Sequence, residues 1–212
     1  LSLDVSMWVD AVVCDYNYVF DPQAYLRRHF QHQRSTAAFL IAEAHNLVER
    51  ARDMFSADLE GWELLEVKRA ISKAAPRCAK ALSQLHTAMR KLGNATEPQD
   101  EPVESSDPSS ELNLFPVKPA AIREQGDGVN TSLEFPESII EPLEAALDEA
   151  EKWLVKNQPA EFREALLALY FRLHSFRRTA EVYDERFVTI IKNNPAIRVR
   201  LFCLDPSLLL RK

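Results

Sequence analysis

Two hydrophobic patterns divide this chain. Short apolar runs occur up to residue 41, and after it apolar residues recur three or four positions apart. Residues 9–14 (VDAVVC) and 38–41 (AFLI) are short and mainly apolar, and the first is rich in β-branched residues, which predicts fully buried strands. Between them, Asp21-Pro22 predicts the start of a helix. Two buried strands joined by one helix indicate a piece of a parallel α/β sheet.

After the second run, apolar residues recur every three or four positions, which predicts helices. One helix is expected to begin at Pro76 and to end near Gly93, a favourable C-cap residue. Two long helices are expected over 137–157 and 160–182. Trp62 lies on one of the apolar stripes, so we expect it in the core.

Two segments interrupt the helical pattern. Residues 95–111 contain six acids, three prolines and no base, so we expect a mobile loop that buries little apolar surface. Near the end, two β-type runs flank Asn193-Asn194-Pro195, which predicts a hairpin with a polar turn. The predicted fold class is mainly α with a small α/β portion.

Composition narrows the classes of function. The 212 residues are 46% hydrophobic with a net charge of −6, so any contact with nucleic acid has to come from local basic patches. No apolar stretch approaches the roughly 20 residues that span a bilayer, and we expect no membrane partner. Cys14, Cys78 and Cys203 are far apart and lack metal-ligand spacing. We therefore expect reduced thiols, no metal site and a cytoplasmic protein.

The second apolar run ends in Ala42-Glu43-Ala44-His45. A strand followed by Asp-Glu-x-His is the form of a Walker B box, in which the Asp holds the Mg²⁺ of the nucleotide and the Glu polarises the attacking water. The alternative is an ordinary strand end with a solvated Glu43 and a capping His45.

Three segments together resemble the XPD/DinG-type superfamily 2 DNA helicases, which are DEAH-box enzymes with an iron–sulfur cluster. They are WVDAVVCDYNYVFDP (8–22), FLIAEAHNLVERARDMFSADL (39–59) and VRLFCLDPS (199–207). The likeness is specific over roughly 1–60 and 185–210, and in between it rests on position and helical character.

The resemblance implies a helical insert, the Arch domain, rooted on a few strands of an incomplete RecA-like motor domain. Residues 1–45 would be a motor fragment with a degenerate DEAH box, 46–184 the Arch with an acidic loop at about 94–112, and 185–212 the return strands. The implied function is that of a fragment of an ATP-dependent DNA helicase. Its Arch would guide single-stranded DNA and assist strand separation, and the remainder of the helicase motor would be its partner.

By the same resemblance, Glu43 would activate water and His45 would couple the site to the second motor domain. Ala42 stands where the family has its Mg²⁺-binding Asp. The four glycines form no phosphate-binding GxxxxGK[ST] loop, and the last cluster cysteine of the family would lie just upstream of Leu1. We therefore expect ATP, Mg²⁺ and a 4Fe-4S cluster in the parent protein, none of them in this chain, and no ATP hydrolysis by the chain alone.

Candidate nucleic-acid contacts fall in two places. By resemblance, Tyr16 and Tyr18 lie near the path of single-stranded DNA, where aromatic rings can stack on bases. Both could instead be packing or surface residues. Basic residues could also form a face that lines a strand-sized pore and contacts phosphates. The alternative is that they are only the solvated face of a helix. The members of this basic face would be Arg172, Arg177, Arg178, Lys192, Arg198 and Arg200.

A second class of function stays open, namely a non-enzymatic helical module that docks other proteins. The apolar stripes over 139–154 and 162–176 and the acidic loop favour it. A third option, a small helical enzyme using Glu43 and His45, lacks a nucleophile or pocket signature.

Overall fold

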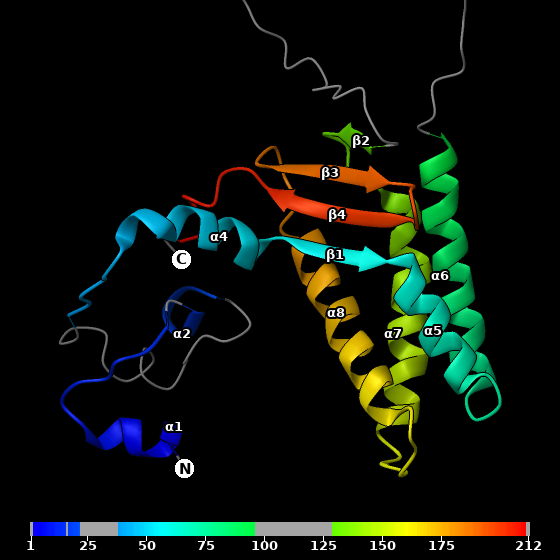
Figure 1. Ribbon diagram of the computed structural model, residues 1–212, viewed down its shortest axis with the longest axis horizontal. Helices are drawn as coiled ribbons and strands as arrows, with labels where there is room; N and C mark the ends of the chain where they lie inside the picture. Colours follow the sequence, from blue (N-terminus) through cyan, green and yellow to red (C-terminus); the bar gives the residue numbers. More distant parts are fainter. Residues whose placement is uncertain (1, 16, 22–37, 96–128, 211–212) are drawn as a thin grey trace, which may run out of the picture.

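The computed structural model describes residues 2–15, 17–21, 38–95 and 129–210. Four long helices pack together, and the strands of a four-stranded antiparallel sheet run across one end of them (Figure 1). The elements in chain order are α1 (Ser2–Val5), η1 (Ser6–Trp8), α2 (Asn17–Phe20), η2 (Ala44–Asn46), α4 (Leu47–Phe55), β1 (Ala57–Glu60), α5 (Gly61–Ile71), α6 (Pro76–Ala95), β2 (Val129–Ser132), η3 (Glu137–Ile139), α7 (Ile140–Leu154), α8 (Arg163–Glu181), β3 (Phe187–Lys192) and β4 (Arg198–Cys203). The chain is mainly helical with a small sheet, as its sequence predicts.

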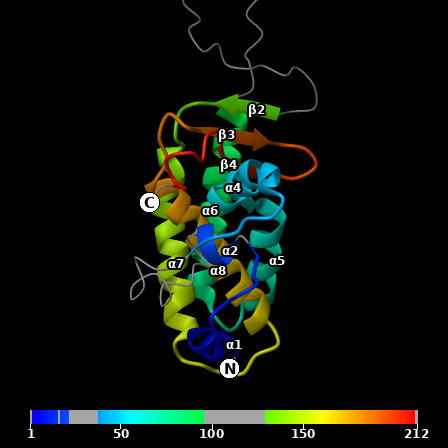
Figure 2. The same cartoon turned by 90° about the vertical axis from the view of Figure 1, so that its left-hand side faces the viewer.

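The helical bundle follows from the three-to-four-residue apolar spacing. On α6, Cys78, Leu82, Leu85 and Met89 are at most 1% exposed, and this face packs between α5 and α7. Helix α8 completes the bundle by packing against α7, α5 and β1, and Figure 2 shows the four helices side by side beneath the strands. The helices predicted over 137–157 and 160–182 are confirmed as η3 with α7, and as α8.

The sheet has the strand order β1-β4-β3-β2, and every neighbouring pair is antiparallel. The predicted hairpin is confirmed, since β3 and β4 pair directly around Asn193-Asn194-Pro195. Because side chains alternate along a strand, Leu59, Val199 and Leu201 enter the bundle core while charged neighbours face outward.

The strands predicted at 9–14 and 38–41 do not form, and both segments have an irregular backbone. Val13 and Leu40 are fully exposed, at 102% and 100%. A buried parallel strand needs paired neighbours and a cover on both faces, and the described sheet offers these segments neither. The sheet is also antiparallel, whereas a parallel piece was expected. The helix predicted from Asp21-Pro22 falls mostly outside the described residues, as does the acidic loop from residue 96 onward.

Three local features differ from the sequence-based expectation. Strand β1 was missed, because a four-residue strand is defined by its partner more than by its own pattern. Trp62 is 50% exposed and lies outside the core. Helix α6 continues past Gly93 to Ala95. A Cβ at Gly93 would lie 2.0 Å from Oδ1 of Asn193, so a larger residue there would displace that side chain.

The helical unit begins and ends at one place. Nε of Arg52, on α4, donates a hydrogen bond to the carbonyl oxygen of Leu204 over 2.9 Å. The hydroxyl of Ser56 accepts one from the backbone N–H of Cys203, also over 2.9 Å. The segment that precedes the bundle and the segment that follows it are therefore in direct contact.

Candidate functional site

The Glu43–His45 pair lies in an open turn ahead of α4. Glu43 has a left-handed backbone with φ of 54°, a conformation that costs a non-glycine residue free energy. Its Oε2 lies 3.5 Å from Nε2 of His45, and their side chains are 71% and 72% exposed. A contact between two side chains this exposed adds little stability.

These residues do not fit a nucleotide-bound Mg²⁺ by themselves. Ala42 offers no carboxylate, and in the described part of the chain no three His, Cys, Asp or Glu side chains are placed to hold a metal ion. The cysteines do not fit a cluster either, since Cys14 is exposed while Cys78 and Cys203 lie in separate apolar clusters. Burial raises the pKa of both buried thiols to about 11, whereas cluster ligands are thiolates.

Of the two candidate tyrosines, the structure describes only one. Tyr18 lies on the short helix α2 and is 40% exposed. Tyr16 falls outside the described residues.

The three α8 arginines do not share a face. Successive helical residues turn by about 100°, so Arg172, Arg177 and Arg178 project about 100–140° apart. Arg172 forms an ion pair of 2.6 Å with Glu63 of α5, which joins the two helices. Arg177 lies 3.5 Å from Glu181, one turn further along α8, and Arg178 is half-buried.

The structure does bring Lys192, Arg198 and Arg200 together on the outward face of the sheet, where Lys192 and Arg198 are cross-strand partners. Nε of Arg198 donates to Asp58 over 3.0 Å, and NH2 of Arg200 donates to Asp53 over 3.1 Å.

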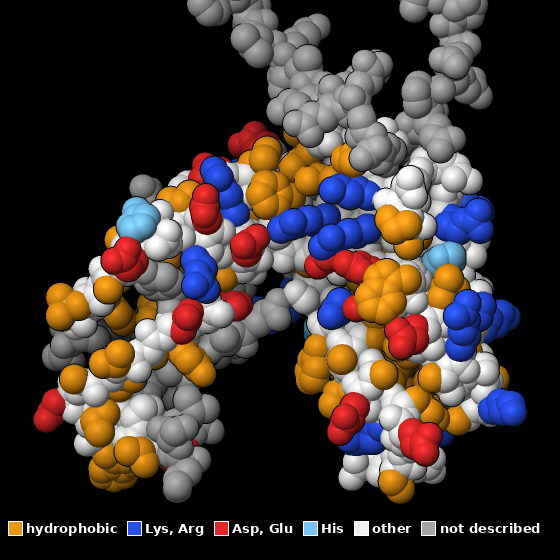
Figure 3. All heavy atoms as spheres, viewed as in Figure 1, with side chains coloured by type: hydrophobic (Ala, Val, Ile, Leu, Met, Phe, Trp, Pro, Cys, Tyr) orange, Lys and Arg blue, Asp and Glu red, His pale blue; other side chains and the backbone are white. Residues whose placement is uncertain are grey.

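Figure 3 shows the result, with basic side chains crossing the sheet and acidic ones beside them. The Arg200 guanidinium also lies 5.0 Å from the ring centroid of Phe202, a cation–π distance. Most of the positive charge on this face is already neutralised by carboxylates of the chain itself.

A different basic surface covers α5 and α6. Residues 67–95 contain no Asp or Glu, although the chain as a whole is acidic. We call their seven basic residues the α5–α6 basic surface; they are Lys68, Arg69, Lys73, Arg77, Lys80, Arg90 and Lys91. In Figure 3 basic side chains gather along the right-hand edge, over these helices.

The α5–α6 basic surface differs from the sheet face because its charges form no close ion pairs with the described residues, although Arg77 interacts electrostatically with Glu149 of α7. Among the described residues, none of the seven lies within 4.0 Å of a carboxylate, whereas Arg172, Arg177, Arg198 and Arg200 all do. The basic face expected from the sequence was placed on residues 172–200, so this surface was missed. The signal was present as a long acid-free stretch.

His86 lies near two residues of this basic surface, Arg90 and Lys68. Partial burial, and then the nearby charges of Arg90 and Lys68, lower the pKa of this imidazole. Nζ of Lys68 donates a hydrogen bond to the hydroxyl of Ser83 over 2.9 Å, which holds the ammonium group between α5 and α6.

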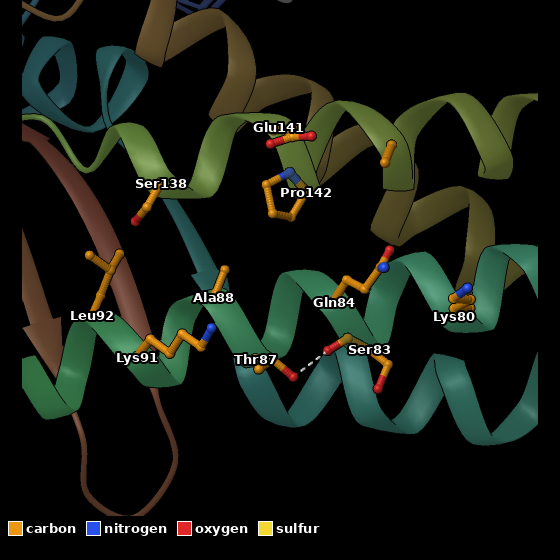
Figure 4. A pocket seen from close by; sticks show the side chains of 11 residues that line it. Lys80, Ser83, Gln84, Thr87, Ala88, Lys91, Leu92, Ser138, Glu141 and Pro142 are labelled. Carbon is orange, nitrogen blue, oxygen red and sulfur yellow. Dashed lines mark hydrogen bonds between the residues drawn. The ribbon is translucent and has the colours of Figure 1, made fainter.

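An open groove of about 740 Å³ runs between α6 and α7, beside this surface. Figure 4 shows Lys80 toward one end of it and Lys91 toward the other, with Gln84 between them and Ser138 and Glu141 on the facing helix. Hydroxyl, amide and ammonium groups dominate the polar lining, and Glu141 is its one carboxylate. The groove thus offers mainly hydrogen-bond donors to an anionic ligand.

No protein-family model matches the sequence, and no curated protein sequence matches it. No described helix is long and apolar enough to cross a membrane.

Proposed function

We propose that this chain is a fragment of an ATP-dependent DNA helicase of the XPD/DinG type, carrying the Arch domain between two pieces of RecA-like motor domain 1. The observation that supports this most directly is the contact between the two roots of the bundle. A domain inserted into another leaves and returns at neighbouring points. Here residues 52–56, just after the AEAH segment, are hydrogen-bonded to residues 203–204, within LFCLDPS.

The exposed apolar residues before α4 also support the proposal. Trp8, Val13 and Leu40 are 89%, 102% and 100% exposed, although their sequence pattern is that of buried strands. A soluble protein rarely leaves such surface uncovered. The remaining motor strands would pair with these segments and cover them.

In this proposal the chain provides the Arch domain and part of the DNA contact. The rest of the parent protein provides the residues that complete the ATP site. Glu43 and His45 would meet the nucleotide only when a phosphate-binding loop is brought to them. Ala42 removes the carboxylate that holds Mg²⁺, so a parent protein with this alanine would hydrolyse ATP slowly.

A helical protein-docking module is the second candidate function. Phe171 supports it, because this α8 side chain is 61% exposed instead of joining the core. A docking module needs exposed apolar anchors, whereas an Arch needs a surface for a phosphate backbone.

The two functions predict different binding. We expect the purified chain to bind a fluorescent single-stranded oligonucleotide weakly, with an affinity that rises steeply as salt is lowered. Absence of binding at the lowest salt would favour the docking module. The chain alone is expected not to turn over ATP, and measurable turnover would contradict the proposed division between fragment and parent.

A further inference from the structure

We propose that the α5–α6 basic surface binds the phosphate backbone of a single nucleic-acid strand, with Trp62 as a platform for one base. This inference rests on the proposed function and assigns its DNA contact to particular residues. They are different residues from the arginines of α8 and the sheet.

The first step is the cost of the surface to the fold. Like charges without counter-charges repel one another, so seven basic residues on adjacent helices destabilise the compact state. Several basic residues elsewhere on this protein are paired with carboxylates, as Arg198 is with Asp58 and Arg172 with Glu63. An anionic ligand would supply the missing counter-charge, which indicates that the cluster serves binding and not stability.

The second step is the arrangement along α6. Lys80, Gln84 and Lys91 follow one side of the helix and line the groove. At 1.5 Å per residue, the two lysines are about 16 Å apart along the axis. A ligand that meets both has to be extended and to carry negative charge at more than one point, as a phosphate backbone does.

The third step is the exposed tryptophan. Trp62 is 50% exposed at the start of α5, and its indole N–H donates to the carboxylate of Glu60, which holds the ring in place. Arg69 lies two turns further along the same exposed stripe, which it shares with Glu66, and Lys73 follows just after the helix. Trp62 is thus a fixed, half-exposed ring next to Glu60, one turn before Glu66 and two turns before Arg69. Aromatic rings combined with basic residues are used to bind single strands without sequence preference.

These features favour nucleic acid over an acidic peptide. The groove contains no aromatic residue, and Leu92 is its one large apolar side chain, so it lacks the anchor pockets that peptide partners use. Phosphate contacts need only point charges and donors, and an acidic peptide gains nothing from a stacking platform.

The test measures binding of a fluorescein-labelled oligo(dT) to the full chain by anisotropy over a salt series. Two independent double variants, Arg69→Gln/Lys73→Gln and Lys80→Gln/Lys91→Gln, each remove two exposed charges. The matched control is Arg50→Gln/Lys156→Gln, which removes two exposed basic residues outside the surface, one on α4 and one in the turn after α7. Each single-strand phosphate contact contributes about 0.7 to the slope of log K against log salt. We expect each surface variant to make the slope shallower by about 1.4 and the control to leave it unchanged.

Trp62→Ala tests the stacking platform, with the exposed Trp8→Ala as its control. Loss of one stacked base should weaken oligo(dT) binding about 5- to 150-fold at constant slope, and Trp8→Ala should not change the affinity. A poly-glutamate peptide of equal charge should bind more weakly than oligo(dT), and Trp62→Ala should not affect it.

Each contrary result has a distinct meaning. If wild type binds oligo(dT) and the surface variants match the control, this inference is wrong while the proposed function stands. If poly-glutamate binds as tightly and Trp62→Ala changes nothing, the ligand is an acidic polypeptide. If wild type binds no oligonucleotide even at low salt, both proposals fail.

Discussion

The hydroxyl of Ser56, the residue just before β1, is hydrogen-bonded to Cys203, the last residue of β4. It accepts a hydrogen bond of 2.9 Å from the Cys203 backbone N–H and donates one of 2.6 Å to the carbonyl oxygen of Arg52. One side chain therefore joins the end of α4 to the end of β4, at the place where the chain enters and leaves the bundle.

Replacing Ser56 should loosen this junction. In Ser56→Ala the partly buried N–H of Cys203 loses its partner, so we expect a loss of about 1–2 kcal/mol in the free energy of unfolding. Urea denaturation followed by circular dichroism measures it. Ser72→Ala is the control, because that exposed hydroxyl bonds only within its own helix end. Equal losses in the two variants would show that the Ser56 link has no special role.

Gly61 should tolerate no larger residue. A Cβ at this position would lie 2.4 Å from Cγ2 of the buried Ile197 and 3.1 Å from its carbonyl oxygen. That carbonyl already accepts the Gly61 N–H over 2.8 Å, so β1, α5 and the β3–β4 turn meet without spare room. We expect Gly61→Ala to cost about 1–3 kcal/mol in urea denaturation.

Two further variants examine the cause of that loss. Gly61→Ala placed in an Ile197→Ala background should cost less than it does alone, because the clashing methyl group is gone. Gly93→Ala should cost less than Gly61→Ala, since the obstacle there is mainly the side-chain amide of Asn193 and alanine favours the helix. The same loss in both Ile197 backgrounds would contradict the clash.

The three thiols should react at two different rates. Cys14 is exposed, whereas Cys78 and Cys203 are buried and have pKa values raised to about 11 by that burial. Because the thiolate is the reactive form, a disulfide reagent at pH 8 should label Cys14 rapidly and the other two only after unfolding in urea. Rapid labelling of more than one thiol in the native protein would contradict the burial of these residues.

Alkaline pH should destabilise the fold through the same two thiols. Their raised folded-state pKa means that the unfolded chain loses these protons first as pH rises. Their contribution to the free energy of unfolding is therefore fully present below the ordinary thiol pKa of about 8.5. It is lost progressively as the pH rises to about 11.

In that window each thiol lowers the free energy of unfolding by at most about 1.4 kcal/mol per pH unit. Cys78→Ala should therefore make the fall in stability with pH shallower, by up to one proton, and Cys14→Ala, at the exposed thiol, should leave it unchanged. Urea denaturation at several pH values from 8 to 11 measures both. Identical pH dependence in wild type and Cys78→Ala would overturn the prediction.

The basic face of the sheet could be predicted from the sequence only in part. Lys192, Arg198 and Arg200 do meet, because alternation along two paired strands places them on one face. Their neutralisation by Asp53, Asp58 and Glu60 could not be seen, since it depends on β1 joining β4 across 140 residues of sequence separation. The basic residues of α5 and α6 were visible in the sequence, but only the structure shows that none of them lies within 4.0 Å of a described carboxylate.

By itself, the sequence determined the four long helices and the β3–β4 hairpin, because the period of apolar residues and the turn residues are local properties that act within a few positions. Only the tertiary structure decided which apolar runs become strands. Residues 57–60 form one because β4 lies beside them, and residues 9–14 do not, because a strand is stabilised by hydrogen bonds to a neighbour that its own sequence cannot supply. The availability of charged side chains also depends on tertiary structure. The sequence places each arginine and lysine on its helix or strand, and the contacts between these elements decide which of them remain available to a ligand.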